Sequence, residues 1–175
     1  ERYANEPAVV GYDLLNEPFI GSPILEAVAS IMKPLAEVAR ESPLNRETLF
    51  EKFSDVALFR RVVDEAGPVF QQFEREKLGP YHQRMSDAIR SVDSRHILFI
   101  EPSPSSNQGV PSALPPVLLP DGSPDPRQAL APHAYDIVTD GPTPEMADEG
   151  RLRFIFDRHM ETARRLNMPM LLGEW

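Results

Sequence analysis

Four short apolar segments, separated by long connections, constrain the fold of this chain more than any other feature. They span residues 8–15, 96–102, 128–135 and 168–175. Short apolar runs bounded by prolines and turn residues predict buried strands. Because helical patterns lie between most of them, the order of elements is typical of parallel βαβ units. The sequence therefore predicts an α/β fold.

Starting signals and apolar residues at helical spacing indicate the helices. Ser22-Pro23 is a helix start, with Ser as the N-cap and Pro at the first helical position. Pro34 is expected to kink or end that helix, and Gly79-Pro80 is expected to interrupt a later one. The remaining helices are expected at about residues 45–66, 68–92 and 145–166.

Composition excludes several classes of function. The formal net charge of −9 argues against a polyanionic partner, so nucleic acid is not expected. No run of 18 apolar residues occurs, so no membrane-spanning segment is expected. The absence of cysteine excludes disulfides and thiolate metal sites. No metal site and no cofactor are expected, while the oligomeric state and the compartment stay open.

Three of the four predicted strands end in a carboxylate, at Glu17, Glu101 and Glu174. Parallel strands point the same way, so their carboxyl ends meet on one face, where such folds place their active sites. His133 and Tyr135 end the third segment, and their alternate spacing puts both side chains on one side of the strand. We expect these five side chains to lie together.

Two carboxylates on different strands of one barrel favour glycoside hydrolysis. One carboxylic acid protonates the leaving oxygen, and a carboxylate on the other side of the anomeric carbon attacks it. The nucleophile must stay ionised, which requires hydrogen-bond donors around it. Asn16, His133 and Tyr135 can supply those donors. The acid can later act as the base toward water, so one residue serves both halves of the reaction.

The motifs around these residues resemble those of family 5 glycoside hydrolases. They are Gly-Tyr-Asp-Leu-Leu-Asn-Glu-Pro, His-Ala-Tyr and Leu-Gly-Glu-Trp, in the order typical of that family. The resemblance implies a partial (β/α)8 barrel, about strands four to seven with their helices, and an incomplete catalytic domain over residues 1–175. The motifs most resemble the endoglycoceramidase-like branch, beside the cellulase-like one.

The resemblance also implies roles for individual residues. Glu17 takes the acid/base role and Glu174 the nucleophile role in a retaining hydrolase. Asn16 holds the 2-hydroxyl of the sugar, while His133 and Tyr135 line the reaction subsite, with Tyr135 placed to hydrogen-bond Glu174. The expected substrate is a β-linked glucan, a mannan or the headgroup of a glycolipid. Family resemblance makes a secreted or extracytoplasmic location plausible.

The chain is expected to be part of a longer protein. It begins at Glu1 without Met and ends at Trp175 in a strand-like segment. A barrel of this class needs about 250 residues, so these strands and long connections cannot close one. Residues that the family contributes from the early and last strands are missing, and poor activity is therefore expected for the fragment alone.

Several alternatives stay open at this point. The chain could be a non-catalytic carbohydrate-binding or degenerate barrel fragment. A barrel aldolase or isomerase is disfavoured because the strand ends show neither a lysine nor clustered metal ligands. Glu101 either binds a sugar hydroxyl or pairs with a cation, and Trp175 either stacks on a sugar or packs. Surface, packing or structural roles are expected for His82, His96, His159, Asp13 and Asp136.

The connection after the first strand offers one more choice. Its apolar residues either pack in the core, which is favoured, or shape a groove for a large or lipid-linked substrate. These residues are Phe50, Phe53, Leu58 and Phe59.

Overall fold

The computed structural model describes residues 2–41, 45–139 and 143–175, and Glu1, the chain start noted above, lies outside them. In this part of the chain, three short parallel strands form one sheet in the order β1-β2-β3. The strands are β1 (Gly11–Asp13), β2 (Ile97–Ile100) and β3 (Gln128–Leu130). The α/β class and the parallel direction predicted from the sequence are confirmed.

The C-terminal segment continues the parallel arrangement without forming a regular strand. Two isolated parallel bridges join it to the third segment, one between Leu130 and Met170 and the other between His133 and Glu174. Three of the four predicted strands thus form, whereas the fourth segment lies in its expected place without becoming a strand, and the regular strands are shorter than the apolar segments that predicted them. Their ends bend into loops, and these loops carry the polar side chains of the site.

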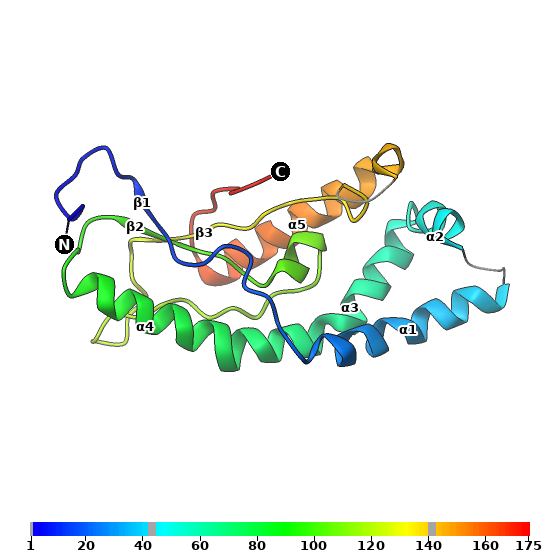
Figure 1. Cartoon of the computed structure of the whole chain (residues 1–175), viewed down its shortest axis with the longest axis horizontal. Helices are drawn as coiled ribbons and strands as arrows, with labels where there is room; N and C mark the ends of the chain where they lie inside the picture. The colour runs from blue at the N-terminus through cyan, green and yellow to red at the C-terminus, as the bar shows by residue number, and fades with distance from the viewer. Residues whose placement is uncertain (1, 42–44, 140–142) are drawn as a thin grey trace.

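Helices connect the strands and cover the sheet (Figure 1). Among the described residues, no helix is both long and apolar enough to cross a membrane. The helices are α1 (Ile24–Glu41), α2 (Arg46–Lys52), α3 (Val56–Phe73), the π-helical turn η1 (Glu74–Leu78), α4 (Gly79–Arg90), the 3₁₀ turns η2 (Pro104–Gln108) and η3 (Pro144–Met146), and α5 (Glu149–Leu166).

Helix α1 continues through Pro34, so the expectation that this proline would end the helix is wrong, while a kink there stays a prediction. A proline inside a helix removes one hydrogen bond and costs about 3 kcal/mol. The cost is offset by packing, because Pro34 is buried and Ile31 and Leu35 beside it contact the apolar cluster formed with α3. In the same way α3 continues through Pro68, where a new helix was expected.

The expected interruption at Gly79-Pro80 is a π-helical turn instead of a break. Figure 1 shows α3 and α4 joined through η1 as one continuous helical run, in which α4 follows the sheet and α3 turns away toward α2. The Gly79 N–H donates to the Glu74 carbonyl, which inserts one extra residue ahead of Pro80. Gly79 is required there, since a Cβ would lie 2.5 Å from Cγ of Pro115 and 3.0 Å from the Glu74 carbonyl oxygen.

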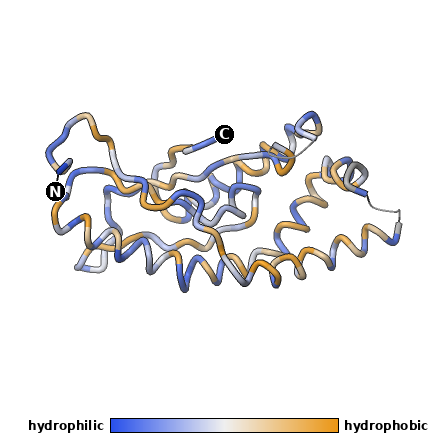
Figure 2. Tube along the Cα trace, viewed as in Figure 1, coloured by the Kyte–Doolittle hydropathy of each residue, from blue (hydrophilic) through white to orange (hydrophobic). Residues whose placement is uncertain are grey.

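Two apolar clusters hold the described elements together, and Figure 2 shows hydrophobic residues recurring along the strands and helices. The first joins the sheet to α5 through Leu98, Leu130 and Ala163. The second joins α1 and α3 to the loop after β1. Phe53 and Phe59 are buried in it, and Phe50 and Leu58 pack against it. These four residues therefore pack in the core, which was the favoured alternative, and do not shape a substrate groove.

Candidate active site

Glu17 lies in the loop that follows β1, with its side chain 39% exposed. Its φ angle is +44°, a left-handed conformation that few residues other than glycine adopt. Three neighbours hold it. The Glu17 N–H donates to Oε2 of Glu101 at 2.8 Å, Nδ2 of Asn107 donates to its Oε1 at 3.3 Å, and Nδ1 of His133 lies 2.9 Å from the same Oε1. The loop therefore presents its carboxylate in one defined direction.

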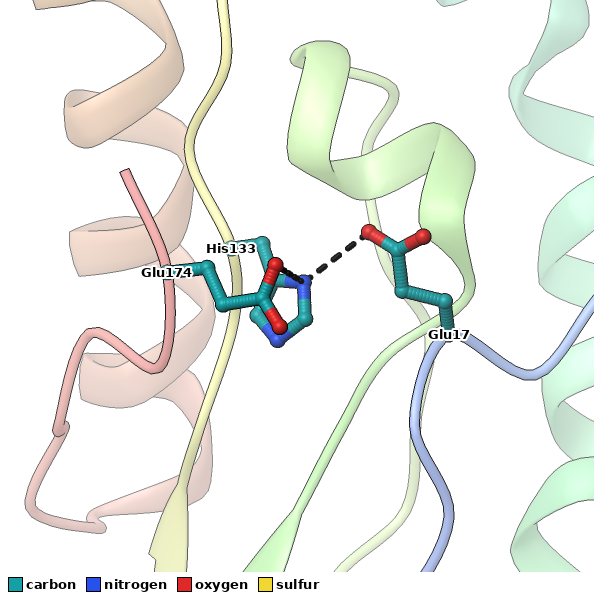
Figure 3. A group of neighbouring side chains, drawn as sticks. All are labelled: Glu17, His133 and Glu174. Carbon is teal, nitrogen blue, oxygen red and sulfur yellow. Dashed lines mark hydrogen bonds and ion pairs between the residues drawn. The ribbon is translucent and has the colours of Figure 1, made fainter.

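His133 is the central residue of the site and is only 2% exposed. Its Nδ1 lies 2.9 Å from Oε1 of Glu17 and 3.5 Å from Oε2 of Glu174. Figure 3 shows the two glutamates reaching this ring from opposite sides. Carboxylate oxygens accept hydrogen bonds, so an ionised Glu17 requires Nδ1 to carry the proton. The imidazole thus holds the two carboxylates at one place.

The backbone of His133 is held as firmly as its ring. Its N–H donates to Oδ1 of Asn107 at 3.1 Å, and its carbonyl accepts a hydrogen bond from Nε2 of His159 at 2.9 Å. His159 is buried on α5, and burial lowers its pKa to about 4, so this ring is neutral near pH 7. A neutral His159 keeps one ring N–H for the His133 carbonyl. Its packing role, expected from the sequence, is confirmed, but the contact with the site was not foreseen.

Glu174 comes from the C-terminal segment, with its side chain 49% exposed. The Tyr135 hydroxyl donates to its Oε2 at 2.7 Å, as the sequence predicts, and the Ala134 N–H donates to its backbone carbonyl at 3.0 Å. Gly173 allows this approach, because a Cβ there would lie 3.0 Å from Cδ2 of His133. One carboxylate oxygen of Glu174 lies within 4.8 Å of one of Glu17.

Glu101 is 1% exposed, so it does not face the surface on which the two other glutamates open. Its Oε1 lies 3.5 Å from Nε2 of His133, a contact that is an ion pair only when the ring is protonated. Binding of a sugar hydroxyl by Glu101 stays a prediction. Burial raises the pKa of Glu101 to about 7. The hydrogen bond from the Glu17 N–H lowers it, the negative charge of Asp13 raises it, and His133 lowers it.

The other predicted site residues lie at the edge of this cluster. Asn16 is exposed and makes no hydrogen bond within the described residues, so its contact with a sugar stays a prediction. Trp175 is 82% exposed beside Glu174, and its stacking role also stays a prediction. Asp136 is structural, as expected, since it forms a buried ion pair with Arg151 at 3.0 Å.

Sequence reasoning missed Asn107, which is buried in η2 and contacts both Glu17 and His133. It lies in a Ser/Pro-rich loop without periodicity, and its position after a strand that ends in Glu101 is the one signal that could have drawn attention to it. Gly109, at φ +91°, ends η2 in the left-handed conformation that this turn requires. A Cβ there would lie 2.8 Å from the Phe154 ring.

The same three side chains could also hold a metal ion. Glu17, His133 and Glu174 each offer one ligand atom, all within 4.8 Å of one another. Two carboxylates and one imidazole form a donor set that divalent transition metals accept. However, the spacing also suits two carboxyl groups on either side of an anomeric carbon.

The family model for cellulases of glycosyl hydrolase family 5 matches residues 1–175. The chain belongs to glycosyl hydrolase family 5. Its fold is a fragment of the TIM barrel of that family, as the strand order and motifs predicted.

Solved structures of endo-glycoceramidase II from Rhodococcus sp. are similar to this family 5 chain. The complex with a cellobiose-like imidazole is 26% identical with a TM-score of 0.51, over 73% of this chain and 33% of that one. The structure of the lactosyl-enzyme intermediate is 25% identical with a TM-score of 0.50, and the match covers 73% of this chain and 32% of that one. The chain thus spans about a third of the length of these structures. No curated protein matched the chain.

Proposed function

We propose that the protein containing this chain is a retaining glycoside hydrolase that cleaves β-glycosidic bonds in a polysaccharide or a glycolipid. Glu17 is the acid/base and Glu174 the nucleophile. The observation that carries the proposal is the approach of their carboxylate oxygens to within 4.8 Å, with His133 between them. Retaining enzymes hold their two carboxyl groups about 5 to 5.5 Å apart, whereas inverting enzymes need roughly 6.5 Å or more.

The surroundings of each glutamate support its role. The Tyr135 hydroxyl donates to Glu174, and His133 Nδ1 lies 3.5 Å from the same carboxylate oxygen, which favours an ionised nucleophile. Attack of Glu174 on the anomeric carbon forms the glycosyl–oxygen bond as the bond to the leaving oxygen breaks. Glu17 gives its proton to that oxygen and then removes one from water, and the resulting hydroxide displaces Glu174.

The similar structures agree with this chemistry. One of the Rhodococcus endo-glycoceramidase II structures is a lactosyl-enzyme intermediate. A glycosyl-enzyme is the species that double displacement forms and that single displacement does not. Asn16 is proposed to bind the 2-hydroxyl of the sugar, and Trp175 to stack on a sugar ring, as family resemblance implies.

An apolar pocket beside the acid/base loop favours a glycolipid as the substrate. The pocket measures about 180 Å³ and lies between the loop after β1, α3 and η2. One of the residues that line it is Phe19, which is 67% exposed and only two residues after Glu17. Because the acid/base contacts the leaving oxygen, an apolar surface next to it suits an apolar leaving group.

The test uses the complete natural protein that carries residues 1–175. Product stereochemistry is followed by proton NMR with a β-lactoside of a lipid alcohol and with a cello-oligosaccharide. Net retention is expected, with the lipid glycoside cleaved faster. Net inversion, or binding of sugar without hydrolysis, would contradict the proposed mechanism, and the second result would instead favour the carbohydrate-binding alternative.

Two variants assign the roles of the glutamates. Glu174→Gln should lower kcat by about 10³-fold or more on every substrate. Glu17→Ala should lower kcat/KM, which reports the first displacement, by about 10²–10⁴-fold on an alkyl glycoside, whose leaving oxygen needs the proton, and much less on a 2,4-dinitrophenyl glycoside. Added azide should restore the activity of Glu17→Ala, because it attacks the glycosyl-enzyme without a base, and the product should be the β-glycosyl azide. The control is Glu65→Gln, an exposed side chain on α3, which should behave as the wild type.

A further inference from the structure

The buried carboxylate of Glu101 has no place in the double displacement described above. It lies directly after β2 and is 1% exposed, and a buried carboxylate costs several kcal/mol unless its surroundings compensate it. A retaining mechanism uses two carboxylates, and those roles are proposed for Glu17 and Glu174. The contacts of each Glu101 oxygen indicate what the third carboxylate does.

The first oxygen of Glu101 holds the main chain of Glu17. Oε2 accepts the Glu17 N–H at 2.8 Å. Glu17 has φ +44°, and a residue other than glycine in this region costs about 1–3 kcal/mol unless its surroundings enforce it. A hydrogen bond from the strained residue's own N–H to a buried carboxyl oxygen at the end of the neighbouring strand is such a constraint.

The second oxygen of Glu101 faces the residue that orients the Glu17 side chain. Oε1 makes no hydrogen bond within the described residues and lies 3.5 Å from Nε2 of His133. The other ring nitrogen of His133 lies 2.9 Å from Oε1 of Glu17. Glu101 thus reaches Glu17 by two routes, one through the main chain and one through the imidazole.

We propose that Glu101 is the positioning residue of the acid/base, holding the left-handed turn at Glu17 and the ring of His133 so that the Glu17 carboxyl meets the leaving oxygen. The proposal rests on the acid/base role of Glu17. Removing Glu101 should release the turn at Glu17, and the carboxyl should move relative to Glu174. A displacement of about 1 Å in a catalytic group can cost 10²-fold in rate.

Glu101→Ala and Glu101→Gln separate positioning from a general loss of structure, with Glu65→Gln as the exposed control. Rates are measured on an octyl β-lactoside, which needs protonation of its leaving oxygen, and on a 2,4-dinitrophenyl β-lactoside, which does not. Glu101→Ala should lose about 100-fold in kcat/KM, which reports the first displacement, on the octyl glycoside, at least ten times more than on the dinitrophenyl glycoside. Glu101→Gln keeps an acceptor for the Glu17 N–H, so it should be about tenfold more active than Glu101→Ala on the octyl glycoside.

Equal losses on both glycosides, or wild-type rates, would overturn the positioning role. If Glu101→Ala does not fold, the nearly isosteric Glu101→Gln must by itself show the larger loss on the octyl glycoside. A crystal structure of the variant gives a readout that needs no activity, since φ of Glu17 and its distance to Nδ1 of His133 should both change. An inactive wild type would refute the proposed function, whereas an unmoved Glu17 would refute only the role of Glu101.

Discussion

The Tyr135 hydroxyl donates a hydrogen bond to Oε2 of Glu174 across 2.7 Å and so joins the end of the third segment to the C-terminal segment. The parallel bridge between His133 and Glu174 sets the same two segments side by side. Backbone and side chain therefore agree in placing Glu174 beside His133.

Tyr135→Phe should lower kcat by about 10- to 100-fold. A hydrogen bond to a charged group contributes about 1.5–3 kcal/mol, and this one orients the proposed nucleophile. The measurement is steady-state hydrolysis of a 2,4-dinitrophenyl β-lactoside, whose rate depends on the nucleophile more than on the acid. Tyr3→Phe, on an exposed tyrosine, is the matched control. An unchanged kcat would show that Glu174 needs no help from the phenol.

Glu74→Ala should destabilise the protein by about 3 kcal/mol or more. Glu74 is fully buried in η1 and accepts hydrogen bonds from the Ser103 N–H and hydroxyl, the Ser112 hydroxyl and the Ala113 N–H. Its loss leaves buried donors unpaired, at about 1–3 kcal/mol each. Urea unfolding measures the change, with exposed Glu76→Gln as the control in the same turn. A loss of stability below about 1 kcal/mol would contradict the role of Glu74 in holding Ser103, Ser112 and Ala113 to η1.

His82→Leu should stabilise the protein, and more so in acid. His82 is fully buried on α4, neither ring nitrogen has a hydrogen-bond partner in the described part of the chain, and burial lowers its pKa from 6.5 to about 4. Since the folded pKa lies below the unfolded one, the unfolded state binds more protons as the pH falls from about 6.5 to 4. The stability of the wild type is therefore present above pH 6.5 and lost on acidification.

The stability gain of His82→Leu should grow by about 2 kcal/mol between pH 7 and pH 5. Urea unfolding at both pH values checks this, with Met85→Leu on the same helix as a control that lacks an ionisable group. A gain that does not depend on pH would show that the pKa of His82 is not lowered in the folded protein.

Removal of divalent metal ions should leave hydrolysis unchanged. Double displacement uses both carboxylates directly on the substrate, so a cation held by Glu17, His133 and Glu174 would compete with the sugar. Dialysis against EDTA, followed by the octyl β-lactoside assay, is the measurement. A loss of activity that Zn²⁺ restores would assign these three residues to a metal centre instead.

The sequence predicted the elements that place the site but not all of their boundaries. Apolar runs and strand-end motifs depend on local patterning, so the positions of β1, β2 and β3 followed from them. The helix ends expected at Pro34 and before Pro68 were wrong, because packing of α1 against α3 offsets the local cost of a proline. Local propensity is decisive only where tertiary packing does not oppose it.

By itself the sequence determined that Glu17, His133, Tyr135 and Glu174 end parallel segments, because strand direction and alternation bring such residues to one edge. Only the tertiary structure decided which atoms meet there. Asn107 enters the site from a loop without periodicity, and Glu101 turns inward to hold the main chain of Glu17. These contacts join residues 84 to 90 positions apart, and their partners are chosen by the packing of the whole fold, which no local pattern records.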